Sequence, residues 1–190
     1  MIKGMQKRIA VFSDTHGNRK DMREAVSRFN PLDLIIHLGD GVHDGIQVAR
    51  EASIPFQGVY GNEDFGADLP GKIMLEIEGW RFLLTHGHHM DINPYHPKDI
   101  WRKNMRDMAL WVEQQGAQSL FFGHAHVPVL QREGGIVLCN PGDQFIGSGS
   151  GSSFALVETG AEAVCFRVFR KRQNEQWDPL LELWLRRHAI

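Results

Sequence analysis

Seven side chains of the kinds that bind divalent metals lie in five short polar segments of the chain. None is a cysteine, and carboxylate, amide and imidazole groups suit first-row metals such as manganese, iron, nickel or zinc better than a structural thiolate site. Each segment follows a short apolar, β-branched run. The sequence therefore predicts a metal site built from several strand ends. The candidate ligands are Asp14, His16, Asp40, Asn62, His86, His124 and His126.

The spacing of these residues strengthens the prediction. Positions 14, 40, 62 and 86 are separated by 26, 22 and 24 residues, about the length of a strand-helix-strand unit. A single Asp-x-His or His-x-His arises by chance in many chains, so the order and the spacing carry the argument. In open α/β sheets, sites form at the carboxyl ends of the strands. We therefore expect the polar segments to meet at such an edge.

The order of the motifs also resembles a known family. The succession Asp-x-His, Gly-Asp, Gly-Asn-x-Asp, Thr-His-Gly-His and Gly-His-x-His resembles the calcineurin-like metallophosphoesterases. The similarity runs from about residue 9 to residue 157. The short chain with Gly61-Asn62-Glu63-Asp64 is most similar to the small YfcE-like phosphodiesterase group.

This resemblance implies an α/β fold of four layers, in which a two-sheet β-sandwich is flanked by helices. It also implies two divalent metal ions, with manganese expected and nickel, iron, zinc or magnesium as alternatives. A hydroxide bridging the two ions would hydrolyse a phosphodiester, because a metal pair binds both ends of an in-line displacement at phosphorus. By their places in the motifs, Asp14, His16 and His126 would hold one ion, Asn62, His86 and His124 the other, and Asp40 would bridge them.

Three further residues are catalytic candidates. Many relatives carry histidine directly after the Asn of the Gly-Asn motif, where it assists the leaving group, but this chain has Glu63 there. Two neighbouring cations lower the pKa of a glutamate, so it is a poor proton donor near neutrality unless burial raises its pKa by more than the metals lower it. His88, two residues after a ligand, is the predicted replacement as general acid. Asp64 is predicted to orient a ligand by hydrogen bonding.

The resemblance leaves other functions open. The same fold could serve a phosphomonoesterase, or a scaffold that binds partner proteins as a retromer subunit resembling this family does. Nucleic acid is also a phosphodiester, but 21 basic against 23 acidic residues leave no basic stripe that would require it as a partner. A small phosphodiester is the favoured substrate, and self-association into a homo-oligomer stays open.

Composition sets the remaining bounds. A chain of 190 residues is expected to form a single domain spanning residues 1–190. No apolar segment has signal-peptide or membrane-spanning character, so we expect a cytoplasmic protein with no membrane partner. The two cysteines, Cys139 and Cys165, lie in apolar runs and are predicted to be buried.

Hydrophobic periodicity predicts the elements that must position the site. Helices are expected over 20–29, 45–52 and 98–115, with Trp101, Met105, Met108 and Val112 of the last one facing the core. His37 is predicted to be a buried, hydrogen-bonded histidine. The chain is expected to end in an amphipathic helix over 179–190. Strands are expected over 8–13, 33–38, 55–60, 73–77, 81–85 and 119–122, and then over 127–131, 136–139, 153–158 and 163–170 as a mostly antiparallel second sheet.

Overall fold

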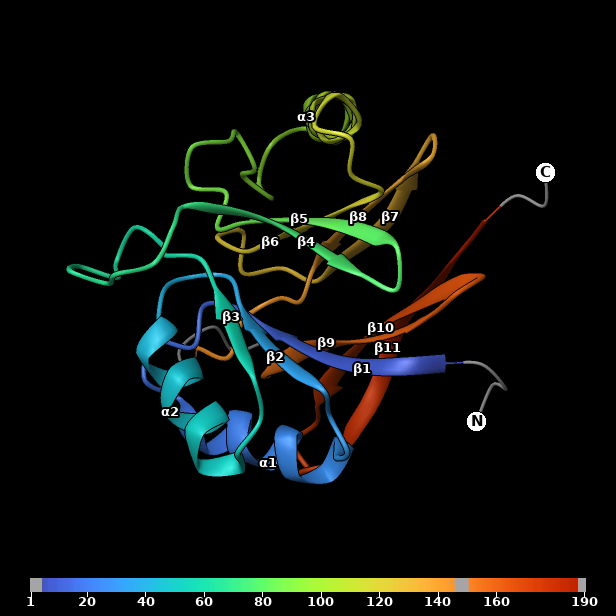
Figure 1. Ribbon diagram of the computed structural model, residues 1–190. Coiled ribbons are helices and arrows are strands. Elements are labelled where there is room, and N and C mark those ends of the chain that lie inside the picture. Colours follow the sequence, from blue (N-terminus) through green and yellow to red (C-terminus); the bar gives the residue numbers. More distant parts are fainter. Residues whose placement is uncertain (1–4, 146–150, 188–190) are drawn as a thin grey trace.

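The computed structural model describes residues 5–145 and 151–187, which form four layers (Figure 1). Helices α1 (Arg19–Phe29) and α2 (Val42–Ala52) cover the outer face of a six-stranded sheet. Helix α3 (Lys98–Gln114) covers the outer face of a five-stranded sheet. The predicted α/β sandwich flanked by helices is confirmed. No helix in the described ranges is long and apolar enough to cross a membrane.

The two sheets are built from different parts of the chain. The six-stranded sheet has the order β11-β10-β9-β1-β2-β3, and the five-stranded sheet has the order β4-β5-β6-β8-β7. The strands are β1 (Met5–Phe12), β2 (Leu34–His37), β3 (Phe56–Gly58), β4 (Lys72–Ile77), β5 (Trp80–Thr85), β6 (Ser119–Phe122), β7 (Val129–Glu133), β8 (Ile136–Asn140), β9 (Ser153–Gly160), β10 (Ala163–Lys171) and β11 (Trp177–Arg186).

The centre of each sheet is parallel. Strand β2 pairs in parallel with β1 and β3, and β6 pairs in parallel with β5 and β8. The carboxyl ends of neighbouring parallel strands lie at the same edge of their sheet. All five polar segments that the sequence singled out follow strands of this kind, namely β1, β2, β3, β5 and β6. This topology is what brings residues far apart in the chain to one place.

Three apolar clusters hold the layers together. The largest lies between the two sheets, where Val164, Phe166 and Val168 of β10 are fully buried at every second position, as a strand requires. A second cluster packs α1 and α2 on the six-stranded sheet. The third packs α3 on the five-stranded sheet. It includes buried Met105, Met108 and Val112 and half-buried Trp101, which confirms their predicted role in the core.

Both cysteines are buried and free, as predicted. Burial raises the pKa of the Cys165 thiol to about 11 and raises the pKa of Cys139 still further. Because the thiolate is the form that binds metal and reacts, neither side chain competes with the polar segments for metal.

The predicted terminal helix over 179–190 is wrong for the part that the structure describes, because residues 177–186 form strand β11. Residues 188–190 lie outside the described ranges. Strand β11 pairs antiparallel with β10, and Leu181, Leu183 and Leu185 pack on the core at every second position. Helical spacing instead grouped Leu180 with Leu183, but Leu180 is 42% exposed. The spacing of the leucines is compatible with both the helical and the strand period, and pairing with β10 makes this segment a strand.

The predicted composition of the second sheet is also wrong. Strands β7 and β8 join β4, β5 and β6, whereas β9 and β10 extend the sheet that begins with β1. Strand β9 lies antiparallel to β1, and β8 lies parallel to β6. Side-chain alternation indicates which face of a strand is buried, but it does not identify the neighbouring strand.

Candidate metal centre

The backbone turns sharply where the polar segments leave their strands. Five of the seven predicted ligands are in the left-handed region, with φ of 51° at Asp14, 43° at His16, 52° at Asp40, 64° at His124 and 55° at His126. This conformation is uncommon for residues other than glycine, and it costs free energy that the surrounding structure must offset. Strained turns of this kind cluster at functional sites. Here they direct the ligand side chains toward one another.

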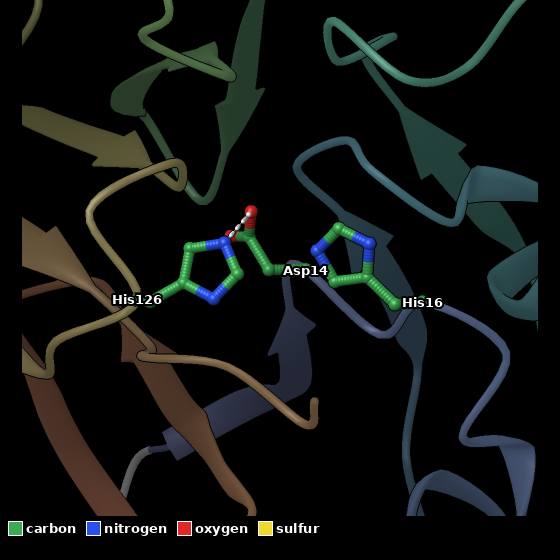
Figure 2. A group of neighbouring side chains, drawn as sticks. All are labelled: Asp14, His16 and His126. Atoms are coloured by element: carbon green, nitrogen blue, oxygen red, sulfur yellow. Dashed lines mark ion pairs between the residues drawn. The ribbon is translucent and has the colours of Figure 1, made fainter. Parts of the chain in front are cut away.

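Asp14, His16 and His126 form the first ligand group (Figure 2). One ligand atom from each lies within 4.8 Å of the other two. His126 Nε2 is 3.3 Å from Asp14 Oδ1, and the rings of His16 and His126 stack with centroids 5.3 Å apart. Asp14 Oδ1 and His16 Nε2 are buried, and neither accepts or donates a hydrogen bond among the described residues. Two buried lone-pair atoms facing a shared space fit a bound cation.

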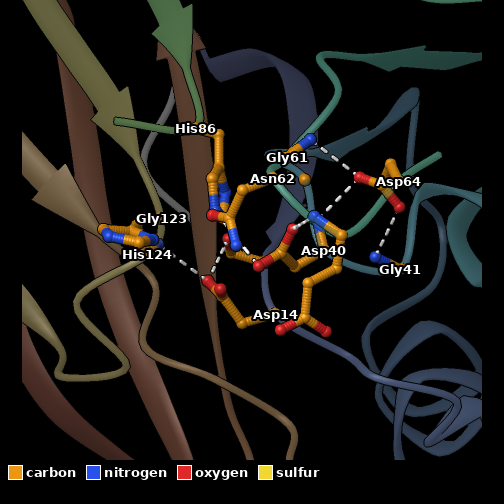
Figure 3. Close-up of polar contacts among 12 residues, drawn as sticks. Asp14, Asp40, Gly41, Gly61, Asn62, Asp64, His86, Gly123 and His124 are labelled. Carbon is orange, nitrogen blue, oxygen red and sulfur yellow. Dashed lines mark hydrogen bonds and ion pairs between the residues drawn. The ribbon is translucent and has the colours of Figure 1, made fainter. Parts of the chain in front are cut away.

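Asp40, His86 and His124 form the second ligand group (Figure 3). His86 Nε2 lies 3.3 Å from Asp40 Oδ2 and 3.1 Å from Asn62 Oδ1. The Asn62 oxygen therefore lies beside this group. All seven predicted ligands are brought together in two adjoining groups.

The two groups are physically linked. Asp14 Oδ2 accepts a hydrogen bond of 3.0 Å from the backbone N–H of His124, so a residue of the first group supports a residue of the second. Asp40 also lies within 4.8 Å of ligand atoms of His16 and Glu63, in a third group of possible ligands. Asp40 therefore stands between His86 on one side and His16 on the other. That is the position a bridging carboxylate would need.

Protonation in the metal-free protein also fits a cation site. Burial raises the pKa of the Asp14 carboxyl above its ordinary value, although the charges of His86 and His126 act in the opposite direction. Burial would lower the pKa of His86, but the Asp40 contact and the charge of Asp14 raise it overall. A divalent cation would stabilise the ionised Asp14 and take the place of the second His86 proton. The donor set thus fits metal ions with oxygen and nitrogen ligands.

The proton positions on two histidines can be inferred from their partners. His86 Nδ1 is 2.8 Å from the carbonyl oxygen of Leu38, which can only accept, so Nδ1 carries the proton. His126 Nδ1 is 2.9 Å from Asp143 Oδ2, and this contact raises the pKa of His126 against the opposing effect of burial. Both rings are left with Nε2 directed at the site. Partners of this kind fix the orientation of metal-binding histidines.

The three predicted catalytic candidates have different surroundings. Asp64 accepts four backbone N–H groups and belongs to none of the ligand groups, so it supports the loops. The His88 ring lies at the opening, with centroid distances of 5.5 Å to His86 and 6.4 Å to His124. Glu63 is 59% exposed, and its Oε2 lies 3.2 Å from His16 Nδ1. The structure does not test their roles in a reaction, which stay predictions.

His37 is fully buried, as predicted, and it supports the first polar segment. Its Nδ1 accepts the Gly39 N–H, so its Nε2 carries the proton that faces Thr15 Oγ1 at 3.2 Å. Burial lowers the pKa of His37 to about 4, which keeps the ring neutral. Thr15 in turn donates to Asp44 Oδ2, which also accepts the Gly17 N–H.

Three residues near the site were missed by reasoning from the sequence. Asp143 pairs with His126, Ser13 donates a hydrogen bond to Asp14 Oδ2, and the Phe145 ring lies 5.3 Å from the His16 ring. Ser13 immediately precedes a ligand and could have been considered. Asp143 and Phe145 belong to no recognisable motif, because both lie in an irregular loop after β8, and the contact of Phe145 joins it to a residue more than a hundred positions away.

Several known proteins are similar to this chain in sequence or in fold. The model of the calcineurin-like phosphoesterase superfamily domain matches residues 8–162. The probable metallophosphoesterase YsnB of Bacillus subtilis is 25% identical over 169 residues, which cover 88% of this chain and 93% of YsnB. Phosphodiesterase MJ0936 of Methanocaldococcus jannaschii is 24% identical over 72% of this chain and 83% of its own. Vps29 of Chaetomium thermophilum has the same fold, with a TM-score of 0.73 at 17% identity over 96% of this chain and all of that one.

Proposed function

Because the chain belongs to the calcineurin-like phosphoesterase superfamily, we propose that it is a phosphodiesterase that uses two divalent metal ions. The observation that carries the proposal is the pair of adjoining ligand groups with Asp40 between them. Manganese is the proposed metal, and a small phosphodiester is the proposed substrate.

Each group of residues has a defined task in this proposal. Two bound divalent cations would polarise a phosphate ester and lower the pKa of a water molecule at the site. Two carboxylates partly neutralise the four positive charges, while neutral asparagine and histidine ligands leave a surplus that attracts the anionic ester. The first ion would be held by Asp14, His16 and His126, and the second by Asn62, His86 and His124, with Asp40 between them.

Two observations support a diester over a monoester. No histidine follows Asn62, so the chain lacks the group that assists the leaving group in many relatives. Activated diesters need that assistance least, because their leaving group departs without a proton. The relative MJ0936 is named a phosphodiesterase. A scaffold remains the second candidate, since the fold is shared with Vps29, but a scaffold does not need all seven ligands.

The first experiment compares one diester with its monoester. Metal-stripped protein should hydrolyse neither bis(p-nitrophenyl) phosphate nor p-nitrophenyl phosphate. Adding manganese should restore hydrolysis of the diester, with the other candidate metals tested in parallel. Faster hydrolysis of the monoester would show that the protein is a phosphomonoesterase and would refute the proposed phosphodiesterase activity. Stoichiometric metal binding with no turnover of either ester would favour the scaffold.

His88→Ala is expected to slow diesters with poor leaving groups by about 100-fold, the usual contribution of a general acid. Burial and the neighbouring His89 and His86 lower the pKa of His88, so its acid form is scarce at neutral pH. The advantage of the wild type on diphenyl phosphate should therefore grow as the pH falls. Bis(p-nitrophenyl) phosphate should be hydrolysed normally.

His89→Ala is the matched control for this substitution, because His89 is exposed and its ring lies 3.7 Å from that of His88. The control should hydrolyse bis(p-nitrophenyl) phosphate at the wild-type rate and should lose no activity on diphenyl phosphate, because the charge of His89 is one of the effects that lower the pKa of His88. Equal losses on the two substrates in His88→Ala, or no loss on either, would exclude His88 as the general acid.

A further inference from the structure

The two ring nitrogens of His16 have different surroundings. Its Nε2 is buried and has no hydrogen-bond partner in the described part of the chain. Its Nδ1 lies 3.2 Å from Glu63 Oε2. A neutral imidazole carries one proton and one lone pair, so it can bind a metal through Nε2 only when Nδ1 holds the proton. An acceptor beside Nδ1 therefore favours the tautomer that the site needs.

The two histidines of the ligand groups with assigned proton positions, His86 and His126, follow the same arrangement. His86 faces the Leu38 carbonyl with Nδ1, and His126 faces the Asp143 carboxylate with Nδ1. In each case Nε2 is left for the ligand group. Glu63 would complete this pattern for His16, and the first group would then contain two histidines that are each backed by a carboxylate.

Glu63 is held where this contact requires it. Its backbone N–H donates a 2.7 Å hydrogen bond to Asp40 Oδ1, which fixes the start of the side chain beside the site. The carboxylate is 59% exposed, and its Oε2 is the atom that faces His16 Nδ1. A side-chain oxygen held in this position can accept the hydrogen bond that an imidazole N–H donates.

We infer that Glu63 is a positioning residue. It accepts a hydrogen bond from the Nδ1–H of His16, and so leaves the lone pair of Nε2 for the metal that Asp14 and His126 would also hold. The inference rests on the metal site of the proposed function. It assigns Glu63 a role different from that of the histidine found at the same place in many relatives. Partners of metal-binding histidines typically change metal affinity by about 10-fold to 100-fold.

Equilibrium dialysis with manganese, followed by metal analysis, tests the inference without turnover. Glu63→Ala should still bind two ions but should bind one of them about 10-fold or more weakly. Glu63→Gln keeps a side-chain oxygen that accepts, so it should restore most of the affinity. Asp68→Ala is the matched control, because Asp68 is an exposed carboxylate of the same loop, and it should bind like the wild type.

A second measurement follows the proton itself. In zinc-loaded protein, the Nδ1 proton of His16 should give a downfield imidazole N–H resonance, because a carboxylate partner slows its exchange with water. The resonance should be present in the wild type and in Glu63→Gln, and missing from Glu63→Ala. Circular dichroism melts of the metal-free proteins would check that all variants are folded.

Three results would overturn the inference. Unchanged affinity in Glu63→Ala would mean that the contact has no role, and wild-type protein that binds no metal would remove its premise. Loss of one ion from Glu63→Ala and Glu63→Gln alike would make Glu63 a direct ligand. The experiments distinguish failure of this inference from failure of the proposed function. Protein that shows the Glu63 effect but hydrolyses no ester would refute the function alone, and normal hydrolysis without the effect would refute only the inference.

Discussion

Replacing Asp40 with asparagine is expected to lower kcat for bis(p-nitrophenyl) phosphate by roughly 1,000-fold, equivalent to about 4 kcal/mol of transition-state stabilisation. Asparagine preserves the shape of the side chain but removes its charge and one of its two acceptor oxygens. Both oxygens are engaged, since Oδ1 accepts the Glu63 N–H and Oδ2 lies 3.3 Å from His86 Nε2. Among the described residues, Asp40 and His16 are the two predicted ligands that lie in two of the ligand groups, and of these only Asp40 is a carboxylate, the kind of group that can bridge two ions.

The electrostatics of Asp40 explain why its charge matters. Burial would raise the pKa of this carboxyl, but the contact with His86, the Glu63 N–H and the charge of His16 lower it below its ordinary value. Asp40 is therefore ionised wherever the enzyme is expected to work. An uncharged amide would leave four metal charges opposed by only one carboxylate, and it would bridge two ions poorly.

The measurement combines steady-state kinetics with metal analysis of each protein. Asp68→Asn makes the same chemical change on an exposed residue and should keep wild-type turnover. Melting temperatures of the metal-free proteins separate a lost site from a lost fold. If Asp40→Asn kept turnover within about tenfold of the wild type, a difference of only about 1.4 kcal/mol, the bridging role would be refuted.

The meeting of the polar segments could be predicted because the sequence repeats one local rule. An apolar, β-branched run ends in a polar residue, and the run is a strand whose carboxyl end faces the site. Asp14, Asp40 and His86 all obey this rule. The rule is local in sequence, so the topology needed only to place the strand ends together. Helical hydrophobic spacing, which is also local in sequence, identified the face of α3 that covers its sheet.

The surroundings of the ligands could not be predicted, because they depend on contacts between distant segments. Asp143 reaches His126 from a loop after β8, and the Leu38 carbonyl orients His86 from a different sheet. A backbone carbonyl has no sequence signature at all. Strand partners have the same difficulty, and this is why β11 and the membership of β7 and β8 were predicted wrongly. Pairing is a property of the assembled sheets.

Asp64→Ala is expected to lower the free energy of unfolding of the metal-free protein by about 3 kcal/mol, since each donor left without a partner costs about 1 to 3 kcal/mol where water is excluded. The Asp64 carboxylate accepts N–H groups from Asp40, Gly41, Val42 and Gly61 at 2.7 to 3.1 Å. It therefore ties the segment that carries Asp40 to the segment that carries Asn62. Metal affinity should fall together with stability.

The pH dependence of this loss identifies its cause. Burial would raise the pKa of Asp64, but the four backbone N–H groups lower it below the ordinary value of 3.8. Because the folded pKa lies below the unfolded one, the ionised carboxylate stabilises the protein above about pH 4, and this contribution disappears as the pH falls through the folded pKa. Urea denaturation should therefore show a large difference between the wild type and Asp64→Ala at pH 7, and this difference should shrink progressively as the pH falls below about 4.

Asp64→Asn is the informative companion, because its amide offers one acceptor oxygen where the carboxylate offers two. It should fall between the wild type and alanine, and its stability relative to alanine should not follow the Asp64 titration. A loss in Asp64→Ala that persists unchanged at low pH would mean that the side chain acts through packing. A loss within about 0.5 kcal/mol, as for an ordinary surface position, would mean that water replaces the carboxylate at all four N–H groups. Either result would require another explanation for the close approach of the Asp40 and Asn62 loops.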